Sequence, residues 1–170
     1  IDHPLSLHAV FKDWTEVAGE SHIADHPGMI DHVYVTNTLD DEKPQASRRV
    51  VNTILESDMI VLGPGSLFTS ILPNIVIEEI GQALLETKAE VAYVCNIMIQ
   101  RGETEHFSDS DHVAALIRHL GSSFRDTVLV NIETVPKDEL HNYPSAEYLV
   151  IVENVFEGSR NMVQPEISYN

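Results

Sequence analysis

The feature that most constrains the fold is an alternation of short apolar segments with amphipathic helical ones. Four apolar segments have the length of β-strands, at residues 59–62, 91–95, 127–130 and 148–152. The stretches between the first three carry apolar residues at the spacing of one helix face. Strand–helix–strand repetition of this kind predicts βαβ units around a mostly parallel sheet, and therefore an α/β fold. The uninterrupted run Met59–Leu62 is typical of a strand covered on both faces.

Apolar side chains at helical spacing predict three helices. The first starts in the turn at Pro44 and the second starts near Pro73. The third opens at Ser108, where Asp111 stands in the place of the glutamate of a capping box. Gly121 provides the stop of this third helix.

The N-terminal segment has the period of strands instead. Residues 5–11 alternate apolar with polar side chains, and residues 15–21 return after a turn, which predicts an antiparallel hairpin. Residues 32–36 are expected to form a further short strand. No repeat, low-complexity tract or flexible linker divides the chain, so residues 1–170 are treated as a single unit.

Acidic residues strongly outnumber basic ones. Asp and Glu total 27 against 10 Lys and Arg, which gives a formal net charge of −17 with histidine neutral. Binding to nucleic acid or to anionic lipid needs a basic surface, so we expect neither partner. An anionic small molecule is compatible with this charge, because backbone N–H groups and a helix N-terminus bind phosphate without Lys or Arg.

The cysteine content and the apolar runs indicate the compartment. The single cysteine, Cys95, lies in an apolar segment and cannot form an internal disulfide, which fits a reducing environment. No apolar run reaches the ~18 residues that span a bilayer, and we recognise no signal peptide. We therefore expect a cytoplasmic protein. Because the sequence opens with Ile1 rather than Met, we also expect a piece of a longer protein.

Polar or glycine-rich segments follow three of the predicted strands. The loop Gly63–Ser70 follows the first strand, Asn96 begins a polar stretch after the second, and Asn131 follows the third. In an open parallel sheet, ligands bind outside the carboxyl ends of the strands. The sequence therefore predicts a ligand site where these three strand ends meet.

The loop Gly63–Ser70 matches no standard phosphate-binding or nucleophile motif. No lysine follows it as in a P-loop, Phe68 stands where a dinucleotide fingerprint needs its last glycine, and G-x-S-x-G is not matched. Its two glycines allow close backbone approach and its three hydroxyls lie near a helix start, which suits a phosphate or a polar sugar. A plain strand-to-helix turn with capping hydroxyls is the alternative.

The polar residues beyond this loop also have two interpretations. Asn96 and Asn131 could hydrogen-bond a base, sugar or phosphate, or they could simply end strands in Asx turns. Glu103 and Glu105 could act as acid and base, or they could belong to a solvated acidic loop.

The histidines do not predict a metal site. His112 and His119 share a helix face, but two helical turns separate them by about 10 Å, which is too far for one ion. Asp109 and Asp111 are expected to serve the N-terminus of the third helix, where negative charge is favoured. No nucleophile with a partner base is evident, so we assign neither a metal ligand nor a catalytic residue.

Two long motifs resemble a known family. One is S-D-M-I-V-L-G-P-G-S-L-F-T-S-I-L-P-N at 57–74, and the other, at 95–113, contains C-N-I-M, Q-R-G-E-T and S-D-S-D-H-V. Shorter stretches at 19–21 and 126–131 match as well. In these motifs the chain resembles the gluconeogenesis-factor family of CofD-like proteins, which are related to 2-phospho-L-lactate transferases.

The resemblance implies a Rossmann-like, three-layer α/β fold. The family's first strand and glycine-rich loop, which form part of its nucleotide site, are absent from these residues. Family members are about twice as long. We therefore interpret residues 1–170 as one partial domain, the C-terminal half of a CofD-like domain, with the predicted antiparallel hairpin at its N-terminus.

The resemblance also implies a function. It implies binding of a uridine-diphosphate amino sugar such as UDP-N-acetylglucosamine, and a cytoplasmic regulatory role in carbon metabolism, cell envelope synthesis and cell shape without catalytic turnover. It implies no required cofactor, and a homodimer is a further expectation. The candidate ligand-binding residues are Gly63, Pro64, Gly65, Ser66, Thr69, Ser70, Asn74, Asn96, Gln100, Glu103, Thr104 and Asn131.

An enzyme is the alternative that the same resemblance leaves open. A transferase of the 2-phospho-L-lactate type would move a phospholactyl group from a nucleoside-diphosphate donor to a deazaflavin and would use Mg²⁺ on the diphosphate. It would need carboxylates that converge on the site, for which the sequence offers Glu103 and Glu105. A structural or interaction module without a functional cleft is the third alternative.

Overall fold

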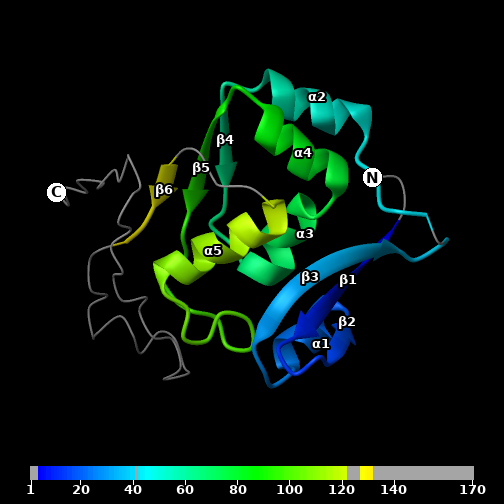
Figure 1. Ribbon diagram of the computed structural model, residues 1–170, viewed down its shortest axis with the longest axis vertical. Helices are drawn as coiled ribbons and strands as arrows, with labels where there is room; N and C mark the ends of the chain where they lie inside the picture. The colour runs from blue at the N-terminus through cyan, green and yellow to red at the C-terminus, as the bar shows by residue number, and fades with distance from the viewer. Residues whose placement is uncertain (1–3, 41, 122–126, 132–170) are drawn as a thin grey trace.

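The computed structural model describes residues 4–40, 42–121 and 127–131. These residues form two three-stranded sheets with helices packed between and beside them (Figure 1). The strands are β1 (Leu5–Phe11), β2 (Glu16–Ala18), β3 (Ile30–Asn37), β4 (Met59–Leu62), β5 (Glu90–Val94) and β6 (Thr127–Leu129). The helices are α1 (Glu20–Asp25), α2 (Arg48–Glu56), the π-helical segment η1 (Leu67–Ile71), α3 (Leu72–Ile75), α4 (Glu78–Glu86) and α5 (Asp109–Leu120).

The N-terminal sheet is antiparallel and has the order β2-β1-β3. The predicted hairpin of β1 and β2 is present, and β3 adds a third strand along the other edge of β1. The return strand ends at Ala18 rather than Ser21, because Gly19 has a φ of 92° and the chain turns there into α1. This short helix buries Ile23 completely, which a continued strand would not do.

The second sheet is parallel and has the order β4-β5-β6, as predicted. Its register places Ile60 beside Val91 and Leu62 beside Tyr93, on the face that the helices cover. Met59 and Val61 point to the opposite face and are 58% and 54% exposed. The expectation that both faces of this strand are covered is therefore wrong for the described residues, in which β4 is an edge strand with no helix over that side.

Two helices begin or continue differently from the sequence prediction. Residues 43–47 are not helical, and α2 starts only after Ser47, whose hydroxyl caps the helix by accepting a hydrogen bond from the amide of Val50. The helix predicted from Pro73 onward is interrupted at Ile77, which has extended backbone angles and a buried side chain. The third helix begins with the predicted capping box at Ser108 and ends at Gly121 with a φ of 70°.

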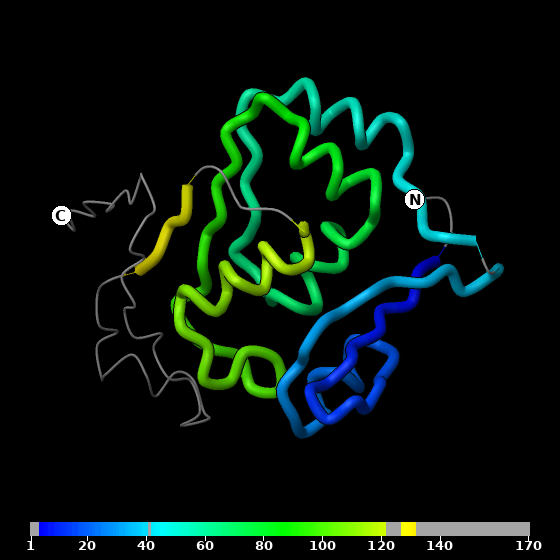
Figure 2. Tube along the Cα trace, viewed as in Figure 1, coloured from blue at the N-terminus to red at the C-terminus, as the bar shows by residue number. Residues whose placement is uncertain are grey.

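One hydrophobic core joins the two sheets. It contains Phe11 and Ile23 from the N-terminal unit, Phe68 from η1, Tyr93 from β5 and Leu116 from α5. Figure 2 shows the helical segments of residues 67–75 and 109–120 running between the antiparallel sheet and the parallel one. The carboxyl ends of β4 and β5 are thereby fixed against the N-terminal unit. The strand predicted at 148–152 lies outside the described residues.

Candidate functional site

The carboxyl ends of β4 and β5 meet through Gly65 and Asn96. The side-chain amide of Asn96 donates to the carbonyl oxygen of Gly65 at 2.9 Å, and its Oδ1 accepts from the Gly65 amide at 3.1 Å. The side chain of Asn96 thus makes one donor and one acceptor bond with the Gly65 backbone, as a residue of a neighbouring strand would. The expectation that these two residues lie on the same rim of the sheet is therefore confirmed.

A second set of hydrogen bonds ties the same loop to residues 100–104. Ser66 Oγ donates to Gln100 Oε1 at 2.7 Å, and Gln100 Nε2 donates to Glu103 Oε1 at 2.9 Å. Thr69 Oγ1 donates to the same carboxyl oxygen, also at 2.9 Å. Thr104 Oγ1 accepts from the Gln100 amide at 2.8 Å and closes the 100–104 turn. These five candidate residues are brought together, and their polar atoms bond to one another.

Glu103 is the buried centre of this network. It is 3% exposed, so the interpretation as part of a solvated acidic loop is wrong for this residue. Burial raises the pKa of the Glu103 carboxyl, while the hydrogen bond from Thr69 and the facing amides of Phe68 and Thr69 act in the opposite direction. Those amides belong to the first turn of η1, so the Glu103 carboxyl faces backbone donors that have no partner within this short helical segment.

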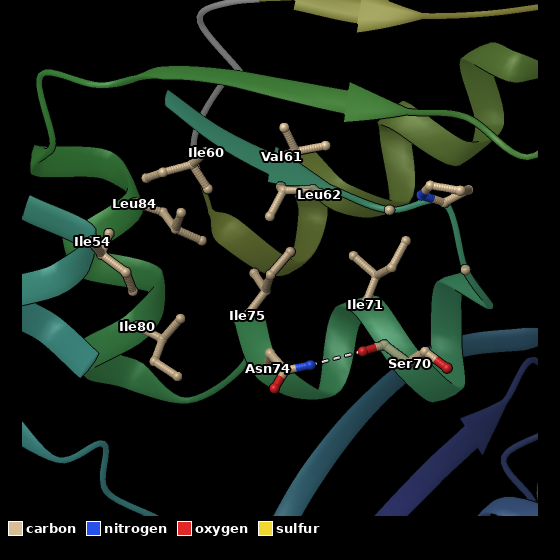
Figure 3. Close-up of a pocket in the computed structure, with 13 residues that line it drawn as sticks. Ile54, Ile60, Val61, Leu62, Ser70, Ile71, Asn74, Ile75, Ile80 and Leu84 are labelled. Carbon is tan, nitrogen blue, oxygen red and sulfur yellow. Dashed lines mark hydrogen bonds between the residues drawn. The ribbon is translucent and has the colours of Figure 1, made fainter. Parts of the chain in front are cut away.

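An open cavity of about 380 Å³ lies on the other side of the loop, between β4 and the helices (Figure 3). The candidate residues at its rim are Gly63, Pro64, Gly65, Ser70 and Asn74. The remaining lining is aliphatic and comes from Ile54, Ile60, Leu62, Ile71, Ile75, Ile80 and Leu84, together with Val61, whose side chain points away from the helical side (Figure 3). Asn74 Nδ2 donates to the carbonyl oxygen of Ser70 at 2.8 Å, so polar atoms gather at one end of an otherwise apolar groove.

A second cavity, of about 330 Å³, lies across η1 and α3 against the antiparallel sheet. Thr69 and Asn74 border it, and Ser6 and Glu20 add polar side chains that the sequence analysis did not assign to a site. Glu20 lies in the 19–21 stretch that matches the family, which is the only signal that pointed to it. Asn74 borders both cavities and is the residue they share.

Asn131 stands apart from these residues. It follows β6, and the sheet order β4-β5-β6 puts β5 between it and the Gly63–Ser70 loop. The third strand end is therefore on the same edge of the sheet, but it is one strand further from Gly65 than Asn96 is.

The cysteine and the start of α5 form a buried polar contact behind the site. Cys95 Sγ donates to Asp109 Oδ1 at 3.2 Å, and both residues are 4% exposed. Asp109 therefore does more than place negative charge in the first turn of α5, since its carboxyl also faces β5. Burial and the Asp109 carboxylate raise the pKa of the Cys95 thiol well above its ordinary range, which makes it a poor nucleophile.

Neither a metal centre nor a membrane span emerges in the described parts of the chain. Within residues 4–40, 42–121 and 127–131, no three His, Cys, Asp or Glu side chains gather as an ion would require. His112 and His119 instead each face a backbone carbonyl one turn earlier, at Ser108 and Ala115. No helix among these residues has the length and apolar character needed to cross a bilayer.

The fold and the site define an α/β protein with an open groove beside its parallel sheet. The loop that follows β4 borders this groove, and Asn96 at the end of β5 holds the loop in place. The family model described as 2-phospho-L-lactate transferase CofD matches residues 1–165. The chain belongs to the CofD family, and within it to the gluconeogenesis factors that the sequence motifs resembled.

Known relatives agree with this assignment. A Bacillus subtilis protein named gluconeogenesis factor is 42% identical over 137 residues, which cover 81% of this chain and 42% of the relative. A Streptococcus pneumoniae relative that carries this name provisionally is 72% identical over 169 residues, 99% of this chain and 52% of the relative. The chain thus spans about half the length of the curated relatives it matches.

A solved structure supports the fold. The crystal structure of a UPF0052 family member from Bacillus halodurans superposes with a TM-score of 0.80 at 33% identity. The match covers 88% of this chain and 47% of the Bacillus halodurans chain. The predicted α/β class, with a parallel sheet and an antiparallel N-terminal unit, is thereby confirmed.

Proposed function

We propose that residues 63–74 and Asn96 form one wall of a nucleotide-sugar site in a regulatory protein of the gluconeogenesis-factor type. The ligand we propose is a UDP-N-acetylglucosamine-like molecule, bound without turnover. The observation that carries the proposal is the two-bond contact between Asn96 and the backbone of Gly65, which holds the loop at the carboxyl edge of the sheet. Ligands of open α/β sheets bind at this edge.

The chemistry of the groove suggests which part of the ligand meets this wall. Its lining is mainly aliphatic, with Ser70 and Asn74 at one end. Such a surface suits the face of a base or the N-acetyl group of a sugar, with hydroxyls directed to the polar end. The start of η1 is filled by Glu103, so we assign the diphosphate to the part of a family-length protein that this chain does not span.

A transferase is the second candidate, because the matching family model is described as a 2-phospho-L-lactate transferase. The buried Glu103 carboxyl, with its raised pKa, has the character of a proton donor. The residues that the structure describes do not fit a Mg²⁺ site, however. Glu103 Oε1 already accepts from Thr69 and Gln100, and no set of three ligands gathers within the described ranges.

Calorimetry on a family-length protein tests the proposal. We suggest a chimera in which these 170 residues replace the matching 169-residue stretch of the Streptococcus pneumoniae relative. UDP-N-acetylglucosamine should bind, and combining Ser66→Ala with Asn96→Ala should weaken binding at least tenfold, about 1.4 kcal/mol. Trp14→Ala, an 85% exposed site on the antiparallel unit, is the control and should leave the affinity unchanged.

Two results would contradict the proposal in different ways. An unchanged affinity in the double variant would reject the assigned wall. Transfer of a phospholactyl group to a deazaflavin by the chimera would reject the regulatory, non-catalytic assignment and favour the transferase.

A further inference from the structure

The cavity of about 330 Å³ on the antiparallel side of η1 and α3 has an apolar floor. Leu7 of β1 and Val35 of β3 are cross-strand partners, and Leu5 points to the same face of the sheet two positions earlier. Pro73 and Ile77 close the space from the helical side. We call this space the second cavity, and its volume suits a small molecule of metabolite size.

Polar groups stand at the border of this floor. Glu20 at the start of α1, Thr69 of η1 and Asn74 of α3 line the second cavity, as does Ser6. Gly19 has a φ of 92°, and the chain turns at this residue from β2 into α1, which brings Glu20 beside the floor. An apolar surface with a few converging polar groups is the usual form of a ligand site.

The charge of the lining determines which ligands fit. Glu20 is exposed, and the residues that line the second cavity include no Lys, Arg or His. Within residues 4–40, 42–121 and 127–131, Glu20 forms no salt bridge. A phosphate or carboxylate ligand would meet an unpaired negative charge there, whereas the net charge of −17 attracts cations to the protein. The second cavity therefore favours a cationic ligand.

The second cavity is connected to the buried network of Glu103. Burial raises the pKa of the Glu103 carboxyl, and the nearby Glu20 carboxylate acts in the same direction. Thr69 joins the two places, because it lines the second cavity while its hydroxyl donates to Glu103 Oε1 at 2.9 Å. A positive charge beside Glu20 therefore offsets the repulsion between the two carboxyl groups, which a neutral ligand of the same shape does not do.

We propose that the second cavity binds a small organic ammonium compound with an aliphatic body. Its ammonium group pairs with the Glu20 carboxylate, and its carbon chain lies against Leu7 and Val35. Asn74 Nδ2 donates one proton to the carbonyl oxygen of Ser70, so in the described part of the chain its second amide proton and its Oδ1 remain for a polar group of the ligand. The second cavity shares Asn74 with the groove but none of the groove's aliphatic residues, so the inference goes beyond the proposed nucleotide-sugar function and does not depend on it.

A titration followed by nuclear magnetic resonance tests the site on the chimera with the Streptococcus pneumoniae relative. The probes are pentylammonium chloride and pentanol, which have the same carbon chain and differ in the charge of the head group. At neutral pH and constant ionic strength, pentylammonium should shift the amide signals of Leu7 and Thr69 saturably and should bind at least about threefold more tightly than pentanol. Glu20→Gln should make the two affinities equal. Asp25→Asn, at another exposed carboxyl of α1, is the control and should keep the difference.

Each other outcome counts against the proposal. Amide signals of Leu7 and Thr69 that do not move, or that move without saturation, would overturn the site. Equal affinities of the two probes in the unmodified chimera would overturn the assigned ligand class. A preference for pentylammonium that persists in Glu20→Gln would show that the charge of Glu20 does not select the ligand, and Glu20→Ala repeats this test if the glutamine variant does not fold. Should the chimera not fold, the same titration of the 170-residue chain decides, because this chain contains every residue that lines the second cavity.

Discussion

Asn96 joins two strand ends by bonding with its side-chain amide to both backbone groups of Gly65. The two residues are 31 positions apart in the sequence. They lie beyond Leu62 and Tyr93, the last paired residues of β4 and β5, and the Asn96 side chain there makes hydrogen bonds that backbone groups would make in a longer strand pair. An asparagine suits this position because its amide offers one donor and one acceptor in the same plane. The loop after β4 therefore takes its position from β5.

Removing this contact should cost stability. Asn96→Ala deletes two partly buried hydrogen bonds and is expected to lower the free energy of unfolding by about 2 kcal/mol. Asn96→Asp keeps the acceptor for the Gly65 amide but sets a carboxylate oxygen against the Gly65 carbonyl oxygen, so its cost should be at least as large. Urea denaturation measures both changes. Asn52→Ala, at an exposed asparagine on α2, is the matched control, and an equal cost at positions 52 and 96 would contradict the bracing role.

Glu103 should make the stability of the protein depend on pH. Burial raises the pKa of its carboxyl, so the folded state holds this proton at pH values where the unfolded chain has released it. The contribution of Glu103 to stability therefore decreases as the pH rises from its ordinary pKa of 4.5 through the raised value. Glu103→Gln removes the charge and keeps an oxygen that accepts from Thr69 and Gln100.

The measurement is urea denaturation of both proteins between about pH 5 and pH 8. Relative to the unmodified chain, Glu103→Gln should gain stability steadily with increasing pH. Glu105→Gln, a neighbouring carboxyl that is only partly buried, should show no comparable gain. A constant difference between Glu103→Gln and the unmodified protein across this range would mean that Glu103 is ionised in the fold.

His119 should make the stability of the protein depend on pH in the opposite direction to Glu103. Its Nε2 accepts from the amide of Val33 at 3.1 Å and its Nδ1 donates to the carbonyl oxygen of Ala115, so the neutral ring is the one that fits. Burial lowers the pKa of His119 below its ordinary 6.5. The stability it contributes is therefore fully present above pH 6.5 and is lost as the pH falls toward the lowered value.

Replacing His119 should expose this dependence. His119→Phe leaves the Val33 amide without its acceptor and should cost about 2 kcal/mol at about pH 7.5. The cost should shrink at about pH 5, where the unmodified protein is itself penalised. His22→Phe, an exposed histidine, is the control and should behave alike at both pH values. Equal costs of His119→Phe at the two pH values would contradict the assigned tautomer.

Local patterns predicted the elements that local forces determine. The sequence predicted the capping box at Ser108, the helix end at Gly121 and the parallel strands. Each of these features depends on neighbouring side chains and on the spacing of apolar residues along the chain. That Gly65 and Asn96 lie at the same edge of the sheet followed from the general rule that parallel strands have their carboxyl ends at one edge. These features did not require knowledge of which distant segment packs where.

The features that the sequence did not predict depend on packing between segments that are distant in the chain. Glu103 lies in an acidic stretch that resembles solvated loop, yet η1 turns two amides and the Thr69 hydroxyl toward it and buries it. Met59 and Val61 belong to an unbroken apolar run, yet they are exposed because the described residues place nothing over that face of β4. The ligand roles of the candidate residues, Asn131 among them, stay predictions.

Gly102 provides the last test, because it holds the 100–104 turn against α1. Its φ is +75°, and a Cβ built at this position would lie 2.3 Å from the carbonyl oxygen of Ala24. Gly102→Ala therefore has to overcome both an unfavourable backbone conformation and a clash with rigid backbone. Gly121 has nearly the same φ, +70°, but nothing lies within 4 Å of the added Cβ.

The two alanine variants separate these costs. Gly121→Ala should lose about 1 kcal/mol of unfolding free energy from the left-handed conformation alone. Gly102→Ala should lose at least about 2 kcal/mol more, since the turn that carries Gln100 and Glu103 must move away from α1. Because that movement releases Ser66 and Thr69 from their partners, Gly102→Ala should also weaken ligand binding by the chimera, whereas Gly121→Ala should not. Equal losses of stability in the two variants would show that the turn shifts freely and does not position the loop after β4.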